Sequence, residues 1–264
     1  MLVIERDFAG GQILGDRSHQ EDTQGFVSLK DGVEGSVESL LTVLADGMGG
    51  ENAGDVASEN VVEHFVSFCH NLEHREDERN IPEILSAATL TANEGVAVAV
   101  EQDPSLEGMG CTLLATAVVD NILYWISVGD SPLYLYREGK LTQINEDHSM
   151  LPILERLVQE GKMSLQEFAV HPYRNTLRSA ITGDELDLVD CPSAGLPLCP
   201  GDIIIVASDG IQTLSDKAIQ NILEGCSACK ADEIIERLLA AVQEAKKPRQ
   251  DNASINVLLS LIHI

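Results

Sequence analysis

Basic side chains are scarce in this sequence. Its 264 residues include 17 Lys and Arg but 43 Asp and Glu, which gives a formal net charge of −26. Proteins that bind nucleic acid or anionic membrane surfaces use clusters of Lys and Arg to neutralise phosphates. The lack of a basic excess therefore argues against a nucleic-acid partner and against docking on a membrane.

Long apolar runs are absent as well. The longest, near 203–207 and 257–262, are far shorter than the roughly 20 residues that cross a bilayer. The first residues, MLVIERDF, have neither the basic start nor the apolar centre of a secretory signal. We therefore expect a cytoplasmic protein with reduced cysteines.

Two common kinds of metal site are also missing. Cys226 and Cys229 have metal-like spacing, but no second cysteine pair or histidine pair supplies the remaining ligands of a zinc site. No loop has the ligand pattern of a calcium-binding EF-hand. We expect the Cys226–Cys229 segment to be a loop with small buried thiols.

Apolar periodicity predicts one domain over residues 1–264, built from antiparallel strands and helices. Residues spaced by three or four, such as Ala57, Val61 and Phe65, predict a helix over 53–72, and a second follows over 81–99 with Pro82 in its first turn. Short apolar runs predict strands at 10–14, 25–29, 39–45, 111–119, 122–128, 133–137, 141–144, 186–189, 202–207 and 254–261, and a further helix is expected over 231–245. The weakly patterned segment 150–184 is expected to be mostly helical or irregular, a flap-like lid or insertion. Strands on both sides of a central helical pair favour layered antiparallel sheets covered by helices.

Acidic residues stand at the edges of several predicted strands. They are Glu21 with Asp22, and Asp46, Asp130, Asp209 and Asp251. A single Asp-Gly pair is often only a turn, but five such positions make that explanation less attractive. Carboxylates repel one another when they cluster unless cations lie between them. Oxygen ligands favour magnesium or manganese over zinc, and the carbonyl of Gly47 could add a neutral ligand.

An ordered series of motifs resembles a known family. The segments GDRSHQED, VLADGMGGENAGDVAS, GMGCTLLA, ISVGDSPLYLYREGKLTQINEDHS, IIIVASDGI and DNASINVLL are similar to those of the metal-dependent serine/threonine protein phosphatases, the protein phosphatase 2C-like or PPM family, in its bacterial form. The resemblance runs from about residue 10 to the C-terminus. It implies an α+β fold, a four-layer α-β-β-α sandwich with two central antiparallel sheets flanked by helices.

The resemblance also implies a binuclear metal centre at one end of the sandwich. Asp46 resembles the carboxylate that bridges two ions, and Asp209 and Asp251 complete the first metal site. Glu21 and the carbonyl of Gly47 belong to the second site. The implied cofactors are two Mn²⁺ or Mg²⁺ ions.

Two further residues have counterparts in the family. Asp130, together with Asp209, corresponds to a weaker third metal site of many bacterial members. Arg17 stands four residues before Glu21, the family spacing of the arginine that binds the substrate phosphate. Arg17, Asp46 and Asp209 are therefore the expected catalytic residues.

The implied activity is hydrolysis of phosphoserine and phosphothreonine in proteins. Two divalent cations about 3.5–4 Å apart lower the pKa of a bridging water, which then attacks phosphorus in line, so that no phosphoenzyme is needed. Met48 stands where the eukaryotic branch has a histidine, and His148 is expected to have a structural hydrogen-bonding role.

The expected partners follow from this activity. They are phosphorylated proteins in a signalling pathway, opposed by a serine/threonine kinase, and the protein itself is expected to be monomeric. The alternative is a phosphatase-like binding or regulatory protein that retains the fold but has weak catalysis.

Overall fold

Two antiparallel sheets pack face to face in the computed structural model, which describes residues 2–4, 6–31, 37–49, 53–70, 80–226 and 228–260. The first sheet contains, in order across it, β1 (Phe8–Ile13), β11 (Ala253–Leu259), β10 (Ile203–Ala207), β7 (Leu133–Arg137) and β8 (Lys140–Gln143). The second contains β2 (Asp22–Asp31), β3 (Val37–Met48), β5 (Leu113–Val119), β6 (Ile122–Val128) and β9 (Leu196–Pro197), and β4 (Gly110–Cys111) pairs with β3.

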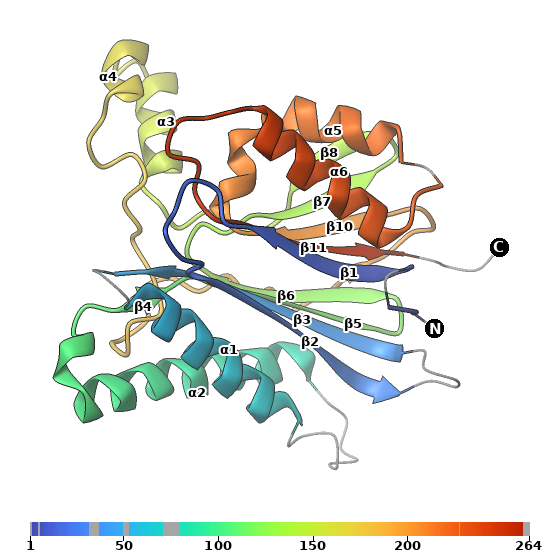
Figure 1. Ribbon diagram of the computed structural model, residues 1–264, viewed down its shortest axis with the longest axis horizontal. Helices are drawn as coiled ribbons and strands as arrows, with labels where there is room; N and C mark the ends of the chain where they lie inside the picture. Colours follow the sequence, from blue (N-terminus) through green and yellow to red (C-terminus); the bar gives the residue numbers. More distant parts are fainter. Residues whose placement is uncertain are drawn as a thin grey trace.

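Helices cover the outer face of each sheet (Figure 1). The second sheet is covered by α1 (Gly54–His70) and α2 (Ile81–Gln102), and the first by α5 (Asp216–Glu224) and α6 (Ala231–Glu244). Two shorter helices, α3 (Leu151–Gln159) and α4 (Leu165–Ala169), project from one end of the molecule. The predicted α+β, α-β-β-α sandwich is therefore confirmed.

The core consists of three apolar layers. One lies between the second sheet and α1 with α2, one between the first sheet and α5 with α6, and one between the two sheets. In β10, Ile203 and Ile205 belong to the layer under the helices, whereas Ile204 and Val206 belong to the layer between the sheets. Because both faces of this strand are buried, its sequence is a continuous apolar run rather than an alternating one.

The structure corrects the sequence prediction in several places. The expected strand at 186–189 is wrong: the segment is irregular, with Leu188 bonded to the hydroxyl of Ser179 and Asp190 bridged to Ser127. Helix α5 was not expected, because its nine residues bury little beyond Ile219 and Leu223. The last strand ends at Leu259, and residue 261 of the expected strand lies outside the described residues.

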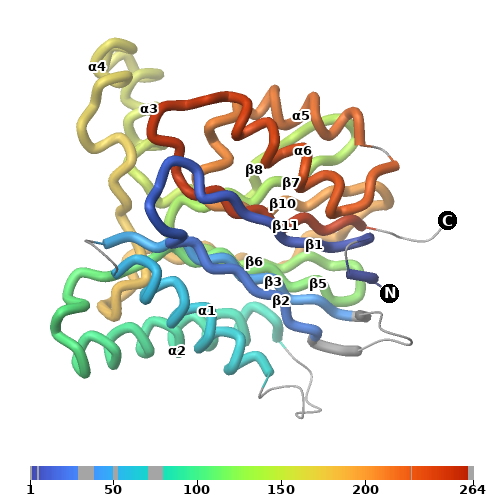
Figure 2. The backbone as a smooth tube through the Cα atoms, viewed as in Figure 1, coloured from blue at the N-terminus to red at the C-terminus, as the bar shows by residue number. Residues whose placement is uncertain are grey.

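The ends of strands from both sheets meet at one end of the sandwich. Asp22 pairs with Asp46 across β2 and β3, and on the opposite sheet β10 ends just before Asp209, while Asp251 lies just before β11 begins. The segment between β1 and β2 crosses from one sheet to the other at this end (Figure 2). None of the helices in the described ranges is long and apolar enough to cross a membrane.

Candidate metal centre

A cavity of about 280 Å³ opens where these strand ends meet. All seven site residues expected from the sequence line it: Arg17, Glu21, Asp46, Gly47, Asp130, Asp209 and Asp251. The remaining lining residues are Met48, Gly49, Thr112, Asn175 and Leu177. Residues from both sheets and from the segment after α4 therefore contribute to one site.

Asp46 is held by backbone pairing on both sides of β3. It lies opposite Asp22 on β2, its amide donates to the Thr112 hydroxyl at 3.0 Å, and its carbonyl accepts from the Thr112 amide at 2.9 Å. Thr112 is itself buried and hydrogen-bonded to the Ser131 hydroxyl at 2.7 Å. This arrangement fixes the backbone from which the Asp46 carboxylate faces the cavity.

Close backbone approach explains two of the glycines. A β-carbon on Gly47 would collide with the carbonyl of Gly54, and one on Gly210 would collide with the carbonyl of Asn252. The Gly47 amide donates to the Glu21 carbonyl at 3.0 Å. Glycine at 47 and 210 therefore brings the segments that carry Glu21, Asp209 and their neighbours together.

Asn252 organises the crossing segment that carries Arg17 and Glu21. Its side-chain oxygen accepts from the Glu21 amide at 2.9 Å, and its side-chain nitrogen donates to the carbonyls of Leu14 at 2.8 Å and His19 at 3.3 Å. Asn252 is only 3% exposed. The residue after Asp251 thus positions side chains that are more than 200 positions away in the sequence.

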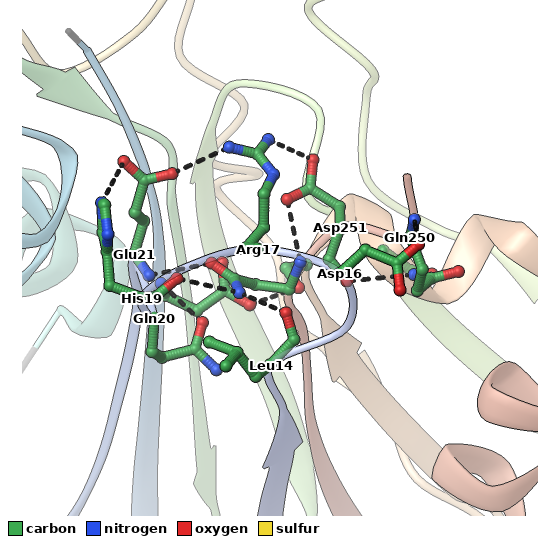
Figure 3. A network of polar contacts seen from close by, with 12 residues as sticks. Leu14, Asp16, Arg17, His19, Gln20, Glu21, Gln250 and Asp251 are labelled. Carbon is green, nitrogen blue, oxygen red and sulfur yellow. Dashed lines mark hydrogen bonds and ion pairs between the residues drawn. The ribbon is translucent and has the colours of Figure 1, made fainter. Parts of the chain in front are cut away.

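Arg17 lies between two of the expected metal ligands (Figure 3). Its guanidinium donates to Glu21 at 3.1 Å and to Asp251 at 2.7 Å. The hydrogen bond to Asp251 raises the pKa of Arg17, so the group keeps its positive charge. A planar, permanently charged donor is thereby held at the mouth of an acidic cavity.

The carboxylates in the cavity raise one another's pKa. Burial, and then the charges of Asp22 and Asp209, raise the pKa of Asp46 well above its usual value. Burial and the charge of Asp209 raise the pKa of Asp130 to about 7, and burial and the charge of Asp251 raise the pKa of Asp209 to about 6. Burial is the largest cause of each shift, and the charges of neighbouring carboxylates add to it, so these acids lie close together in a partly dehydrated site.

These properties fit divalent cations in donor chemistry and in charge. The candidate ligands are carboxylate oxygens and one carbonyl, which suit magnesium or manganese. Behind them, Asp22 is 4% exposed, and its Oδ1 has no hydrogen-bond partner among the described residues, while its Oδ2 accepts from Ser208 at 2.8 Å. Within the described ranges, no three His, Cys, Asp or Glu side chains lie close enough together to coordinate one metal ion as they stand. The acids instead line a shared wall, where Arg17 bridges Glu21 and Asp251.

Several residues around the site were given no role in it from the sequence. Asp22 was grouped with Glu21 among the acids at strand edges but not among the ligands, and Asn252 follows the predicted ligand Asp251, so their positions in the motifs were the available signal. Asn175 and Leu177 belong to the weakly patterned 150–184 segment, and no sequence signal placed them at the cavity.

His148 does not line the cavity. It is 1% exposed, its Nδ1 accepts from the Gly129 amide at 3.2 Å, and burial lowers its pKa. These contacts agree with the expected structural role, since they hold the turn that precedes Asp130.

Known proteins share this fold and are similar to this chain in sequence. A family model described as protein phosphatase 2C matches residues 30–250. The chain belongs to the protein phosphatase 2C family. Arg17, Glu21 and Asp251 lie outside the matched range, and the folded structure brings them to the same cavity as Asp46 and Asp209.

The similar proteins are bacterial members of this family. The chain is 35% identical over 219 residues to the serine/threonine protein phosphatase PstP of Mycobacterium tuberculosis, covering 82% of the chain but 40% of that relative's length. It is 30% identical to the serine/threonine phosphatase stp of Listeria innocua, with 76% of each protein covered.

Solved structures extend the comparison over nearly the whole chain. The crystal structure of the M. tuberculosis phosphatase PstP/Ppp has a TM-score of 0.75 at 31% identity, over 96% of this chain and 97% of that one. The catalytic domain of PstP in complex with two manganese ions has a TM-score of 0.72 at 31% identity, over 95% of this chain and 96% of that one.

Proposed function

We propose that this protein hydrolyses phosphoserine and phosphothreonine in proteins, with Mn²⁺ or Mg²⁺ as cofactor. The observation that carries the proposal is the cavity at the end of the sandwich, where acids from both sheets meet beside Arg17. Membership of the protein phosphatase 2C family supports it. Its similarity to serine/threonine phosphatases and to a PstP structure that contains manganese ions supports it as well.

The acids of the cavity have separate roles in this proposal. Asp46, Asp209 and Asp251 would hold one cation, and Asp46, Glu21 and the Gly47 carbonyl would hold a second. Asp130, with Asp209, would provide a weaker third site. Two bound divalent cations supply Lewis acidity, which lowers the pKa of water and offsets the charge of the phosphate. A direct attack by water needs no phosphoenzyme.

Arg17 is the proposed phosphate ligand. Its planar fork can donate two parallel hydrogen bonds to phosphate oxygens, a geometry that the point charge of a lysine does not reproduce. Its side chain is 47% exposed at the mouth of the cavity, so a phosphate can reach it. Binding a phosphate there compensates the loss of the contacts with Glu21 and Asp251.

Met48 has no role in proton transfer. It lines the cavity at the position where the eukaryotic branch has histidine, but a thioether has no proton to donate. The proton for the leaving serine or threonine oxygen therefore comes from another group.

The test is hydrolysis of p-nitrophenyl phosphate and of a phosphothreonine peptide with Mn²⁺, Mg²⁺ or EDTA. We expect turnover with metal and none with EDTA. Asp46→Ala and Asp209→Ala should lower the rate by about a hundredfold or more, because metal-ion catalysis supplies several kcal/mol. Asp187→Ala, on an exposed loop residue, is the matched control and should retain wild-type activity.

The same experiment separates the enzyme from the alternative. The enzyme hypothesis is wrong if folded wild-type protein releases no more phosphate with Mn²⁺ than with EDTA. If that protein still binds the phosphopeptide, it is a binding or regulatory protein instead. Arg17→Lys provides a second measurement. Because lysine lacks the planar pair of donors of the guanidinium, KM for the phosphothreonine peptide should rise.

The wider biological setting is part of the proposal. A phosphoprotein substrate requires a serine/threonine kinase that made it, and we place both in a cytoplasmic signalling pathway. This partner, that location and the monomeric state remain predictions.

A further inference from the structure

A pair of cysteines lies at the turn between α5 and α6, away from the cavity. Cys226 follows the C-terminal end of α5, and Cys229 stands two residues before α6 begins at Ala231. The Cys229 amide donates to the Cys226 carbonyl at 3.0 Å. Residues joined by such a turn have Cα atoms closer than about 7 Å, which overlaps the range that a disulfide requires.

The Cys229 thiol is near enough to act on the pKa of Cys226. Both cysteines are free thiols, and burial first, and then Cys229, raise the pKa of the Cys226 thiol. The Cys226 thiol donates to the Ile222 carbonyl at 3.1 Å, and Arg237 of α6 donates to the Cys226 sulfur at 3.5 Å and to the Gly225 carbonyl at 3.2 Å. These contacts fix the orientation of the Cys226 thiol at the turn.

The two thiols differ in accessibility. Cys226 is 3% exposed and packs in the apolar layer under α5 and α6, whereas Cys229 is half-buried at the edge of this layer. A reagent in solution can therefore reach Cys229 and not Cys226. An accessible thiol with a buried thiol beside it is the arrangement needed for a two-step thiol–disulfide exchange.

We propose that Cys226 and Cys229 form a reversible disulfide by exchange with a low-molecular-weight disulfide such as oxidised glutathione. The Cys229 thiol loses its proton, and its sulfur attacks one sulfur of the external disulfide, which releases one thiolate. The Cys226 thiol then loses its proton and attacks the Cys229 sulfur, which releases the second thiolate. The two protons convert the released thiolates to thiols, so two cysteines are oxidised and one external disulfide is reduced to two thiols.

This site is independent of the proposed phosphatase activity. Neither cysteine lines the cavity, and the exchange uses no metal ion. In a reducing compartment, dithiol pairs that oxidise do so transiently, as redox-sensing groups, and a turn that can close and reopen fits that behaviour. Oxidation removes the donor to the Ile222 carbonyl but leaves the bond between Arg237 and the Gly225 carbonyl in place.

The test is mass spectrometry of the full chain equilibrated in glutathione buffers of increasing oxidised fraction. Trypsin cleaves after Lys217 and Lys230, so residues 218–230 form one peptide that holds both cysteines and no others. After acid quenching and alkylation, we expect this peptide to be lighter than its reduced form by two hydrogen masses and to carry no alkyl group. Dithiothreitol should reverse the change.

Variants assign the order of the two steps. Cys226→Ser should trap one glutathione on Cys229, because the second attack is lost, whereas Cys229→Ser should leave Cys226 unmodified. Cys199→Ser removes an exposed cysteine elsewhere and should not alter disulfide formation. If either pair variant fails to fold, the wild-type peptide still decides the question. Two results would overturn the proposal in glutathione buffers that oxidise the other cysteines of the protein. In the first, both thiols of the 218–230 peptide remain reduced and become alkylated. In the second, Cys229 carries a glutathione while Cys226 remains a free thiol.

Discussion

Asn252 shows how one buried amide can connect both ends of the chain at the site. Its three side-chain hydrogen bonds, to Leu14, His19 and Glu21, hold the crossing segment against the start of β11. An alanine there would leave buried backbone groups without partners, which is more costly than the loss of an exposed hydrogen bond. Groups that orient metal ligands also affect metal affinity without touching the ion.

We therefore predict that Asn252→Ala lowers the free energy of unfolding by about 1–3 kcal/mol. The Mn²⁺ concentration needed for half-maximal activity should rise by about 10–100-fold, because Glu21 is no longer held in place. Urea denaturation and metal titration of p-nitrophenyl phosphate hydrolysis measure the two effects.

Asn93 provides a matched control for Asn252→Ala. It is also a buried asparagine, and it bonds the Asp184 carbonyl at 2.7 Å and the Gly183 amide at 3.0 Å, away from the cavity. Asn93→Ala should lower stability similarly but leave the Mn²⁺ requirement unchanged. If the Mn²⁺ concentration needed for half-maximal activity is unchanged in Asn252→Ala too, Asn252 stabilises the fold but does not position the metal site.

Among the helices and strands, apolar periodicity predicted the long helices and the strands that are buried on both faces. Helices α1 and α2 have long apolar stripes, and β6 and β7 match their expected bounds. Two short elements were not predicted from the sequence. Helix α5 buries only a narrow face, and strand β9 has two residues. The apolar residues at 186–189 resembled a strand, yet they lie in an irregular loop because side-chain and bridge contacts replace a strand ladder.

The site was predictable for a different reason than the fold. The acids belong to short motifs, so Asp46, Asp130, Asp209 and Asp251 could be identified without knowing the topology. The cavity residues Asn175 and Leu177 could not, because their position depends on how the 150–184 segment returns to the body. Backbone bonds at its base, from Met150 to Thr176 and from Arg178 to His148, bring them there.

The tip of this segment, residues 160–173, is predicted to select protein substrates without contributing to chemistry. It exposes apolar side chains, with Leu165 at 72%, Val170 at 80% and Tyr173 at 63%, and these are available to contact another protein. Replacing the tip with a Gly/Ser linker keeps α3, Asn175 and Leu177. Hydrolysis of p-nitrophenyl phosphate should be unchanged, while relative rates on different phosphoproteins should shift.

A small change at another turn serves as the control for the tip replacement. Asn121 has a positive φ of 62° in the turn between β5 and β6, which glycine adopts without strain, so Asn121→Gly should alter neither activity. Loss of p-nitrophenyl phosphate hydrolysis together with phosphoprotein hydrolysis in the tip replacement would contradict this division of roles.

Across the whole molecule, negative charge is distributed unevenly. Five acids line the cavity: Glu21, Asp46, Asp130, Asp209 and Asp251. They account for a small part of the excess, because the other 38 acids still outnumber the 17 basic residues. The 150–184 segment has four basic and four acidic residues and is neutral. An approaching substrate therefore meets a strongly negative body and a neutral flap beside the cavity.

This field should make the enzyme prefer phosphothreonine peptides with basic flanks, in a manner that depends on salt. We predict that kcat/KM for a Lys-flanked peptide exceeds that of an Asp-flanked one by about tenfold or more at low ionic strength, since charge raises or lowers encounter rates over long distances. The Debye length falls from about 30 Å at 0.01 M to about 8 Å at 0.15 M, so KCl should shrink the ratio. A Gln-flanked peptide at fixed Mn²⁺ controls for effects of salt on catalysis. A ratio that is the same at both salt concentrations would place the preference in direct contacts at the cavity instead of in the charge of the whole molecule.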